Sequence, residues 1–138
     1  SIFFKELIKN HISSKFNVKL FIPDKKIEFN LRKQSFKRSI LNIIENSKRY
    51  SKNIEINIKK TEDSLVIFID DDGPGINKQD RENALRPFYR LETSRNKNTG
   101  GTGLGLSIAN NIILSHGGKL ELLSSPLGGL RVKLSLPQ

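Results

Sequence analysis

Apolar and polar residues along the chain follow two periods, one typical of strands and one typical of helices. Segments in which apolar residues alternate or run continuously predict strands with a buried face. These segments cover residues 18–22, 27–31, 54–58, 65–69, 120–123 and 130–136. Pro23-Asp24 separates the first two as a turn does, so we expect a hairpin there, and residues 126–129 form the turn between the last two.

Helical spacing of apolar residues predicts the remaining elements. Residues 2–12 come close to this spacing, and a short helix is expected at 80–85. Ser35 is the predicted cap of a helix that continues to about Tyr50. Its apolar face contains Phe36, Ile40, Ile43, Ile44 and Ser47. The last predicted helix ends at Gly117-Gly118 and has its apolar face at Leu104, Ile108, Ile112 and Ile113.

These elements predict an α+β fold, a two-layer α/β sandwich with helices on one face of a mixed sheet. The 138 residues are expected to form a single domain, 1–138, of which 1–14 is a linker or helix belonging to an upstream segment. The chain contains no Met and no Cys, so we expect a fragment of a longer protein without disulfides or thiolate metal sites. No run of about 18 apolar residues predicts a membrane span, and no signal peptide pattern opens the chain.

The formal net charge of +10 arises within residues 1–60, because acidic and basic residues balance beyond them. A basic half can attract nucleic acid, acidic lipid or an acidic protein. No aromatic stacking platform accompanies the charge, so we expect a solvated basic surface and no nucleic-acid partner.

Polar residues gather on one face of the helix predicted to end near Tyr50. Asn42 and Asn46 are four residues apart and share a face, followed on that face by Arg49 and Tyr50. Neutral amide oxygens suit Mg²⁺, which keeps waters and phosphate ligands, and Arg49 suits phosphate oxygens. The alternative is an ordinary solvated helix face.

A second polar motif, Asp70-Asp71-Asp72-Gly73-Pro74-Gly75, comes directly after an apolar strand. Its glycines allow close approach of a ligand, and an ionised carboxylate can accept a hydrogen bond from the exocyclic amine of adenine. A cation cage of three carboxylates is disfavoured, since consecutive residues of a strand point in alternating directions. An acidic turn with no ligand is the other reading.

The third motif, Gly101-Thr102-Gly103-Leu104-Gly105, enters a helix. Bare amides and a helix N-terminus together form an anion site, although the pattern is neither a P-loop nor a dinucleotide fingerprint. The alternative is a flexible hinge. Arg86, Arg90 and Arg95 precede this motif, and the last two can neutralise terminal phosphates or simply be solvated. His11 and His116 have no cluster of partners that predicts catalysis.

The three motifs in this order resemble the catalytic and ATP-binding domain of sensor histidine kinases, in the superfamily that includes gyrase, the Hsp90 chaperone and MutL. The resemblance covers roughly residues 15–136. Its boxes match Asn42–Tyr50, Asp71–Gly75, Pro87-Phe88-Tyr89-Arg90 and Gly101–Gly105. The amino-acid sequences of the last two boxes are similar to those of osmosensor-type kinases. The family has the Bergerat α/β sandwich fold, with an ATP lid that corresponds to residues 77–103.

The resemblance implies ATP and Mg²⁺ as cofactors and a role for each matching residue. Asn46 matches the Mg²⁺ ligand, with Asn42 beside the metal and phosphates, and Asp71 matches the acid that reads adenine. Asn42, Asn46 and Arg90 are the implied catalytic residues. The further nucleotide-binding positions are Arg49, Tyr50, Gly73, Gly75, Ile76, Arg95, Gly101, Thr102, Gly103, Leu104 and Gly105.

One position separates kinases from hydrolases in this superfamily. Gyrase-type ATPases carry a Glu, the general base for water, where this chain has Asn42, whose amide cannot take a proton. Glu45 is one residue off that face. Ser47 stands where the family usually has Ala. The phosphoacceptor box of the family is absent, since His11 does not match it, so the chain is expected to bind ATP without phosphorylating itself.

The resemblance therefore predicts a protein-histidine kinase fragment that transfers phosphate to a His on an upstream dimerisation and phosphoacceptor domain. A cognate response regulator, a homodimeric full-length protein, a monomeric fragment and a place on the cytoplasmic side of an inner-membrane receptor are implied with it. The rival functions are an anti-sigma-type serine kinase and a module that binds nucleotide without catalysis.

Overall fold

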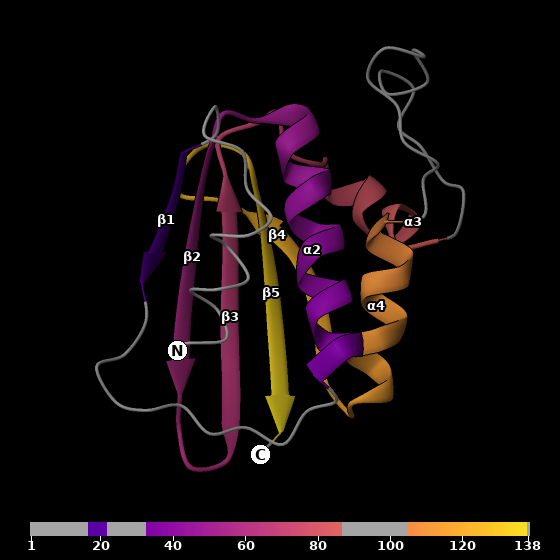
Figure 1. The fold of residues 1–138 in the computed structure, drawn as a ribbon. Coiled ribbons are helices and arrows are strands. Elements are labelled where there is room, and N and C mark those ends of the chain that lie inside the picture. Colours follow the sequence, from indigo (N-terminus) through magenta and orange to yellow (C-terminus); the bar gives the residue numbers. More distant parts are fainter. Residues whose placement is uncertain (1–16, 22–32, 87–104, 138) are drawn as a thin grey trace.

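The computed structural model describes residues 17–21, 33–86 and 105–137, which form a sheet covered on one side by helices (Figure 1). The strands are β1 (Asn17–Phe21), β2 (Asn53–Lys60), β3 (Ser64–Asp71), β4 (Lys119–Ser124) and β5 (Leu130–Pro137). The helices are α2 (Lys33–Tyr50), α3 (Arg81–Ala84) and α4 (Gly105–Ser115), with the 3₁₀ turn η1 (Lys78–Asp80) before α3.

The sheet is mixed, as the sequence predicts. Its strand order is β1-β2-β3-β5-β4, in which β1 and β2 are parallel and every other pair is antiparallel. The parallel pair is explained by the connection through α2, since parallel neighbours need a crossover of a dozen or more residues. The last strand in sequence, β5, lies inside the sheet between β3 and β4.

The core lies between the sheet and the two long helices. Alternation in β2 and in the first six residues of β3 turns one face of each strand inward, and the predicted apolar face of α2 is buried against it. Its members are Phe36, Ile40, Ile43, Ile44 and Ser47, each at most 1% exposed. Burial of a large apolar side chain contributes about 1.5–3 kcal/mol, so packing of this face accounts for much of the stability of α2.

The predicted apolar face of α4 is partly wrong. Ile113 is buried as expected, but Ile108 and Ile112 are only half-buried, while Leu106 and Ala109 are buried. This helix packs against both α2 and β4, so the side chains that face its two neighbours, rather than one simple stripe, are enclosed. Leu104 lies outside the described residues.

Two other expectations need correction. The helix α2 begins at Lys33, so Ser35 lies within its first turn and does not cap it. Asp70 and Asp71, which the motif placed after the strand, are the last residues of β3. The predicted helix over 2–12 and the strand over 27–31 lie outside the described residues, as does the hairpin that would pair it with β1.

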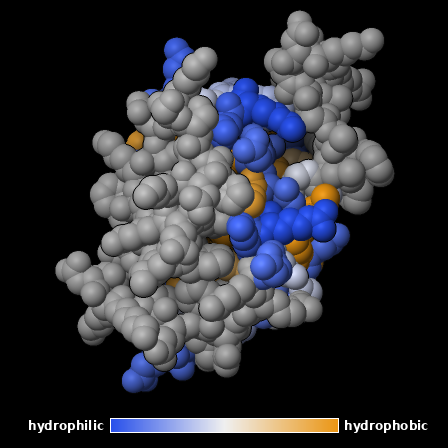
Figure 2. All heavy atoms as spheres, in the orientation of Figure 1, coloured by the Kyte–Doolittle hydropathy of each residue, from blue (hydrophilic) through white to orange (hydrophobic). Residues whose placement is uncertain are grey.

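Most of the exposed residues that the structure describes are polar. Where described residues reach the face seen in Figure 2, they are mostly hydrophilic. Among the described residues, the large hydrophobic side chains at the surface are Tyr50, 37% exposed, and Leu114, 55% exposed. Within the same residues, no helix is both long and apolar enough to cross a membrane.

Candidate functional site

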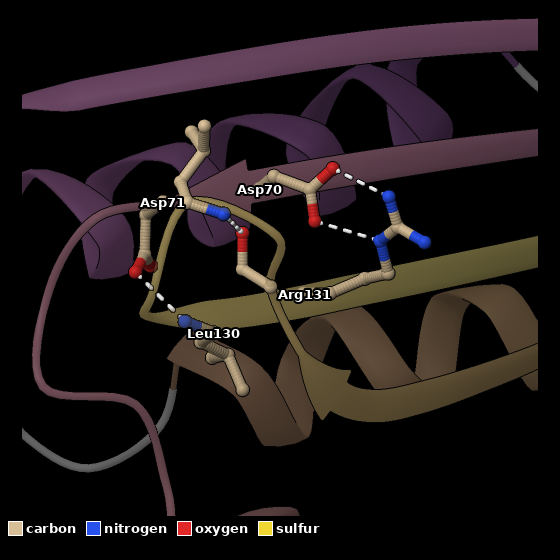
Figure 3. A network of polar contacts seen from close by, with 6 residues as sticks. Asp70, Asp71, Leu130 and Arg131 are labelled. Atoms are coloured by element: carbon tan, nitrogen blue, oxygen red, sulfur yellow. Dashed lines mark hydrogen bonds and ion pairs between the residues drawn. The ribbon is translucent and has the colours of Figure 1, made fainter.

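Asp71 is the centre of the candidate site. It ends β3, and its side chain is buried at 3% exposure. Two backbone amides donate to the same carboxylate oxygen, Oδ1: that of Gly73 at 3.0 Å and that of Leu130 at 2.9 Å. Figure 3 shows the bond from Leu130. The carbonyl oxygen of Asp71 accepts a third bond, from the amide of Gly129 at 3.2 Å. The β4–β5 turn therefore holds this carboxylate in place.

Burial raises the pKa of the Asp71 carboxyl above its ordinary value of 3.8. Hydrogen bonds from the amides of Leu130 and Gly73 and from the hydroxyl of Ser47 act in the opposite direction. Ser47 is itself buried on α2, so its hydroxyl joins that helix to the end of β3. A buried carboxyl with a perturbed pKa is a typical feature of functional sites.

Glycines allow the chain to pass close to Asp71. A β carbon on Gly73 would lie 2.7 Å from the carbonyl oxygen of Tyr50, and one on Gly129 would lie 2.5 Å from the amide nitrogen of Gly73. Gly75 has a φ of +72°, which strains other residues, and packs near the carbonyl of Gly129. The loop after β3 thus lies tightly between the end of α2 and the β4–β5 turn.

The helix α2 reaches Asp71 through the hydroxyl of Ser47, and its predicted polar face differs in exposure from residue to residue. Asn42 and Asn46 are half-buried, and Arg49 and Tyr50 are exposed. Among the described residues, the Nδ2 atom of Asn42 is buried and has no hydrogen-bond partner. The backbone of Asn42 lies against the start of α4, because a β carbon on Gly105 would be 3.6 Å from its carbonyl oxygen. The residue that carries this unsatisfied donor therefore has its backbone next to the first residue of α4.

The three consecutive aspartates have three separate environments, as alternation along a strand predicts. Asp70 pairs with Arg131, through bonds of 2.7 Å and 3.0 Å to the Nε and Nη2 atoms, and points away from Asp71 (Figure 3). Asp72 bonds to the turn between α2 and β2. Within the described part of the chain, no group of acidic or histidine side chains is arranged to hold a metal ion.

The described part of the predicted lid is fastened to the domain. The short helix expected at 80–85 is present as η1 and α3, and Ala84 is buried. Arg81 donates to the carbonyl of Ile76 at 3.0 Å and to the hydroxyl of Ser124 at 2.9 Å. Ile76 packs partly against the core. Arg86 is exposed.

Several predicted site residues fall outside the described residues. They are Arg90, Arg95, Gly101, Thr102, Gly103 and Leu104. Gly105 is described, and it is the first residue of α4, while the anion site predicted from this motif stays a prediction.

Sequence reasoning missed the contribution of the β4–β5 turn. It identifies Gly129 and Leu130, whose amides hold Asp71, only as a turn and the start of a strand. The doublet Gly128-Gly129 before an apolar strand is the available signal, but nothing in the sequence connects it to an acid 59 positions before Leu130.

A family model described as histidine kinase-, DNA gyrase B- and HSP90-like ATPase matches residues 32–138. Among curated proteins, the chain is 46% identical over 97 residues to the sensor histidine kinase CpxA of Escherichia coli K12. That match covers 70% of this chain and 21% of the relative. The sensor protein RstB of the same strain is 39% identical over 101 residues, covering 72% and 23%. The chain therefore spans about a fifth of the length of these relatives.

Solved structures agree with the fold. The histidine kinase domain of the E. coli osmosensor EnvZ is 31% identical, with a TM-score of 0.74 and coverage of 98% of this chain and 83% of that one. A mycobacterial sensor histidine kinase, MprB, has a TM-score of 0.77 at 22% identity, covering 99% and 91%.

Fold and relatives together define a nucleotide-binding domain of the two-layer Bergerat class. The chain belongs to the histidine kinase-, DNA gyrase B- and HSP90-like ATPase family. Within that family it corresponds to the ATP-binding catalytic domain of sensor histidine kinases. The resemblance to osmosensor-type kinases agrees with the EnvZ match.

Proposed function

We propose that this domain binds ATP with Mg²⁺ and presents the γ-phosphate to a histidine on a separate, upstream domain. The observation that carries the proposal is the buried Asp71 carboxylate, which accepts two backbone amides on Oδ1 and a bond from Ser47. An ionised carboxylate has about four acceptor positions. One position therefore remains for a further donor, which the exocyclic amine of adenine supplies and guanine, with a carbonyl there, does not.

The polar face of α2 fits the triphosphate and its metal. The buried and unsatisfied Nδ2 of Asn42 is the donor that a phosphate oxygen needs, and the backbone of the same residue lies near Gly105 at the start of α4. Asn46, one turn further along, offers an amide oxygen to Mg²⁺, and Arg49 offers a guanidinium to phosphate. A bound Mg²⁺ would neutralise charge on the phosphates.

The residues available at the site favour transfer to another domain over hydrolysis. An amide cannot act as a general base, so Asn42 orients phosphate without activating water. The contribution of this chain is then positioning and charge neutralisation. Arg90 and Arg95, with the glycines at 101–104, are proposed to complete the phosphate site from the lid.

The remaining partners are inferred from the class of relatives, which are named sensor kinases. We propose that the whole protein is a homodimer with a dimerisation and phosphoacceptor domain before this one, and that it passes phosphate to a cognate response regulator. In this proposal the domain lies on the cytoplasmic side of a membrane receptor, and the isolated domain is monomeric, which light scattering would test.

The nucleotide site is tested by calorimetric titration of this chain with ATP and GTP in the presence of Mg²⁺. We expect ATP to bind in clear preference to GTP. Asp71→Asn should remove most of the ATP affinity, because the new amide group presents a donor to the amine of adenine. Asp63→Asn, at an exposed turn between β2 and β3, is the control and should bind as the unaltered chain does. Equal affinity of the Asp71→Asn chain would refute the adenine role.

The kinase activity is tested on a longer chain that includes the upstream histidine. Incubation with ATP and Mg²⁺ should produce acid-labile phosphohistidine on that residue. Absence of phosphohistidine while ATP is bound would favour a module that only binds nucleotide.

A further inference from the structure

Asp72 connects two segments that are far apart in the sequence. Its Oδ1 accepts the backbone amides of Lys52 at 2.9 Å and Asn53 at 3.1 Å, and its Oδ2 accepts the side-chain amide of Asn53 at 2.6 Å. All three donors belong to the two residues that lead from α2 into β2. A single carboxylate therefore ties the loop after β3 to the end of α2.

The two tied segments carry the two halves of the proposed nucleotide site. Asp71, next to Asp72, lies on the base side, and α2 carries Asn42 and Asn46 on the metal and phosphate side. The last turn of α2 is fixed to the connection into β2 by the hydroxyl of Ser51, which donates to the carbonyl of Ser47 at 2.6 Å. A shift of the loop after β3 relative to this turn changes the spacing between the halves.

We propose that Asp72 is a positioning residue that sets the spacing between the base-reading carboxylate and the metal- and phosphate-binding face of α2. This inference rests on the proposed function. Asp72 itself touches neither half: its carboxylate is engaged by Lys52 and Asn53, whereas Asp71 points into the protein. Loss of the bonds from Asp72 to Lys52 and Asn53 should leave the base side able to bind adenosine and the phosphate side able to bind phosphates. Binding of the whole ATP molecule should be impaired.

Two observations separate this role from plain stabilisation. Asp72 is exposed, so the hydrogen bonds compete with water and contribute little to the free energy of unfolding. Their donors nevertheless hold the carboxylate ionised: the side-chain amide of Asn53, then the backbone amides of Asn53 and Lys52, keep the pKa of Asp72 below its ordinary value. The carboxylate is thus ionised when it accepts these bonds at neutral pH, and the exposed contact adds little to stability.

The test compares three ligands on four versions of this chain. Adenosine reports the base half, magnesium tripolyphosphate reports the phosphate half, and ATP with Mg²⁺ reports both together. Weak binding is followed by NMR titration and tight binding by calorimetry. The chains are the unaltered one, Asp72→Ala, the conservative Asp72→Asn, and Asp63→Ala as a matched exposed control in the turn at the opposite end of β2 and β3.

We expect Asp72→Ala to weaken ATP binding by about tenfold or more, since a displacement near 1 Å is enough for such losses. Its affinity for adenosine and for tripolyphosphate should stay within about twofold of the unaltered chain. Asp72→Asn keeps an oxygen for the two backbone amides and should recover most of the ATP affinity. Asp63→Ala should change none of the three.

Different outcomes identify different errors. If Asp72→Ala weakens adenosine as much as ATP, or leaves ATP unchanged, the positioning role is refuted while the nucleotide site stands. If the unaltered chain does not bind ATP with Mg²⁺, the proposed function fails first. Should Asp72→Ala unfold, Asn53→Ala removes the 2.6 Å bond, leaves both backbone amides in place, and should show a smaller loss with the same preference for the whole ligand.

Discussion

Replacement of Gly129 by alanine tests how strictly the β4–β5 turn controls Asp71. The added β carbon would lie 2.5 Å from the amide nitrogen of Gly73 and 2.6 Å from the carbonyl oxygen of Asp71, and it would meet Oδ1 of Asp71 more closely still. These atoms are backbone, or a carboxylate held by backbone, so none can rotate away. The turn must move as a whole.

The magnitude depends on the contacts that such a movement disturbs. Overpacking of a tight site costs about 1–3 kcal/mol. The bonds from Gly129 and Leu130 to Asp71 are stretched or broken, and a hydrogen bond to a charged group is worth roughly 1.5–3 kcal/mol. We expect the free energy of unfolding to fall by about 3 kcal/mol, and ATP affinity to fall by about 100-fold because the carboxylate is displaced.

Gly128→Ala is the control in the adjacent position. Gly128 has a φ of +100°, and a β carbon added there would have no other atom within 4 Å, so alanine meets strain but no obstruction. Left-handed backbone costs roughly 1–2 kcal/mol for other residues. We expect Gly128→Ala to lose stability in urea titrations but to keep its ATP affinity by calorimetry. Unchanged ATP affinity of Gly129→Ala, or an equal loss in both variants, would refute the reasoning.

Three further predictions concern titration and the polar network. Burial raises the pKa of Asp71 in the folded domain above its ordinary value of 3.8. Between pH 3.8 and this raised pKa, the folded domain therefore binds more protons than the unfolded chain does. The contribution of Asp71 to the free energy of unfolding therefore falls as pH rises through that interval, whereas the affinity for adenosine rises as the carboxyl ionises. Urea titrations at several pH values should show the first trend and NMR titrations with adenosine the second. Asp71→Asn should abolish both. Ser47→Ala removes a hydrogen-bond donor to Asp71, so it should raise the pKa of this carboxyl further and weaken ATP binding several-fold. NMR of the carboxyl carbon would report the pKa and calorimetry the affinity. An unshifted pKa would contradict the bond from Ser47. Arg131→Ala leaves the carboxylate of Asp70, at 1% exposure, without its ion-pair partner, so we expect a loss of about 2 kcal/mol in urea titrations at unchanged ATP affinity; a parallel loss of ATP affinity would show that Asp70 belongs to the site.

Local patterns in the sequence predicted most of the fold. Ile54, Ile56 and Ile58 alternate because one face of β2 is buried, and the burial of the strand follows this pattern residue by residue. The face of α2 was equally readable, since its apolar residues recur at helical spacing and all of them are buried. The face of α4 was not, because two neighbours enclose it and the choice of partner is a property of the tertiary structure.

In the candidate site, too, some features could be predicted from local sequence and others could not. Asn42, Asn46 and Asp71 stand in contiguous motifs, so a role could be predicted for each of them from neighbouring residues. The groups that hold them could not. Leu130 reaches Asp71 through a backbone amide, which leaves no side-chain signature in the sequence. Asp72 looked like part of an acidic turn, and its contact with Asn53 depends on the pairing of β2 with β3.

The position of β5 determines when, during synthesis of the chain, the sheet and the hydrogen bonds to Asp71 are completed. Asp71 receives one of its hydrogen bonds from Leu130, the first residue of a strand that lies between β3 and β4. On the ribosome, β3 therefore emerges long before the strand that covers its edge, and until then it presents unpaired backbone groups to other chains. A chain halted before β5 lacks both the strand that pairs with β3 and the Leu130 amide that bonds to Asp71, so nucleotide retention would distinguish finished molecules from truncated ones.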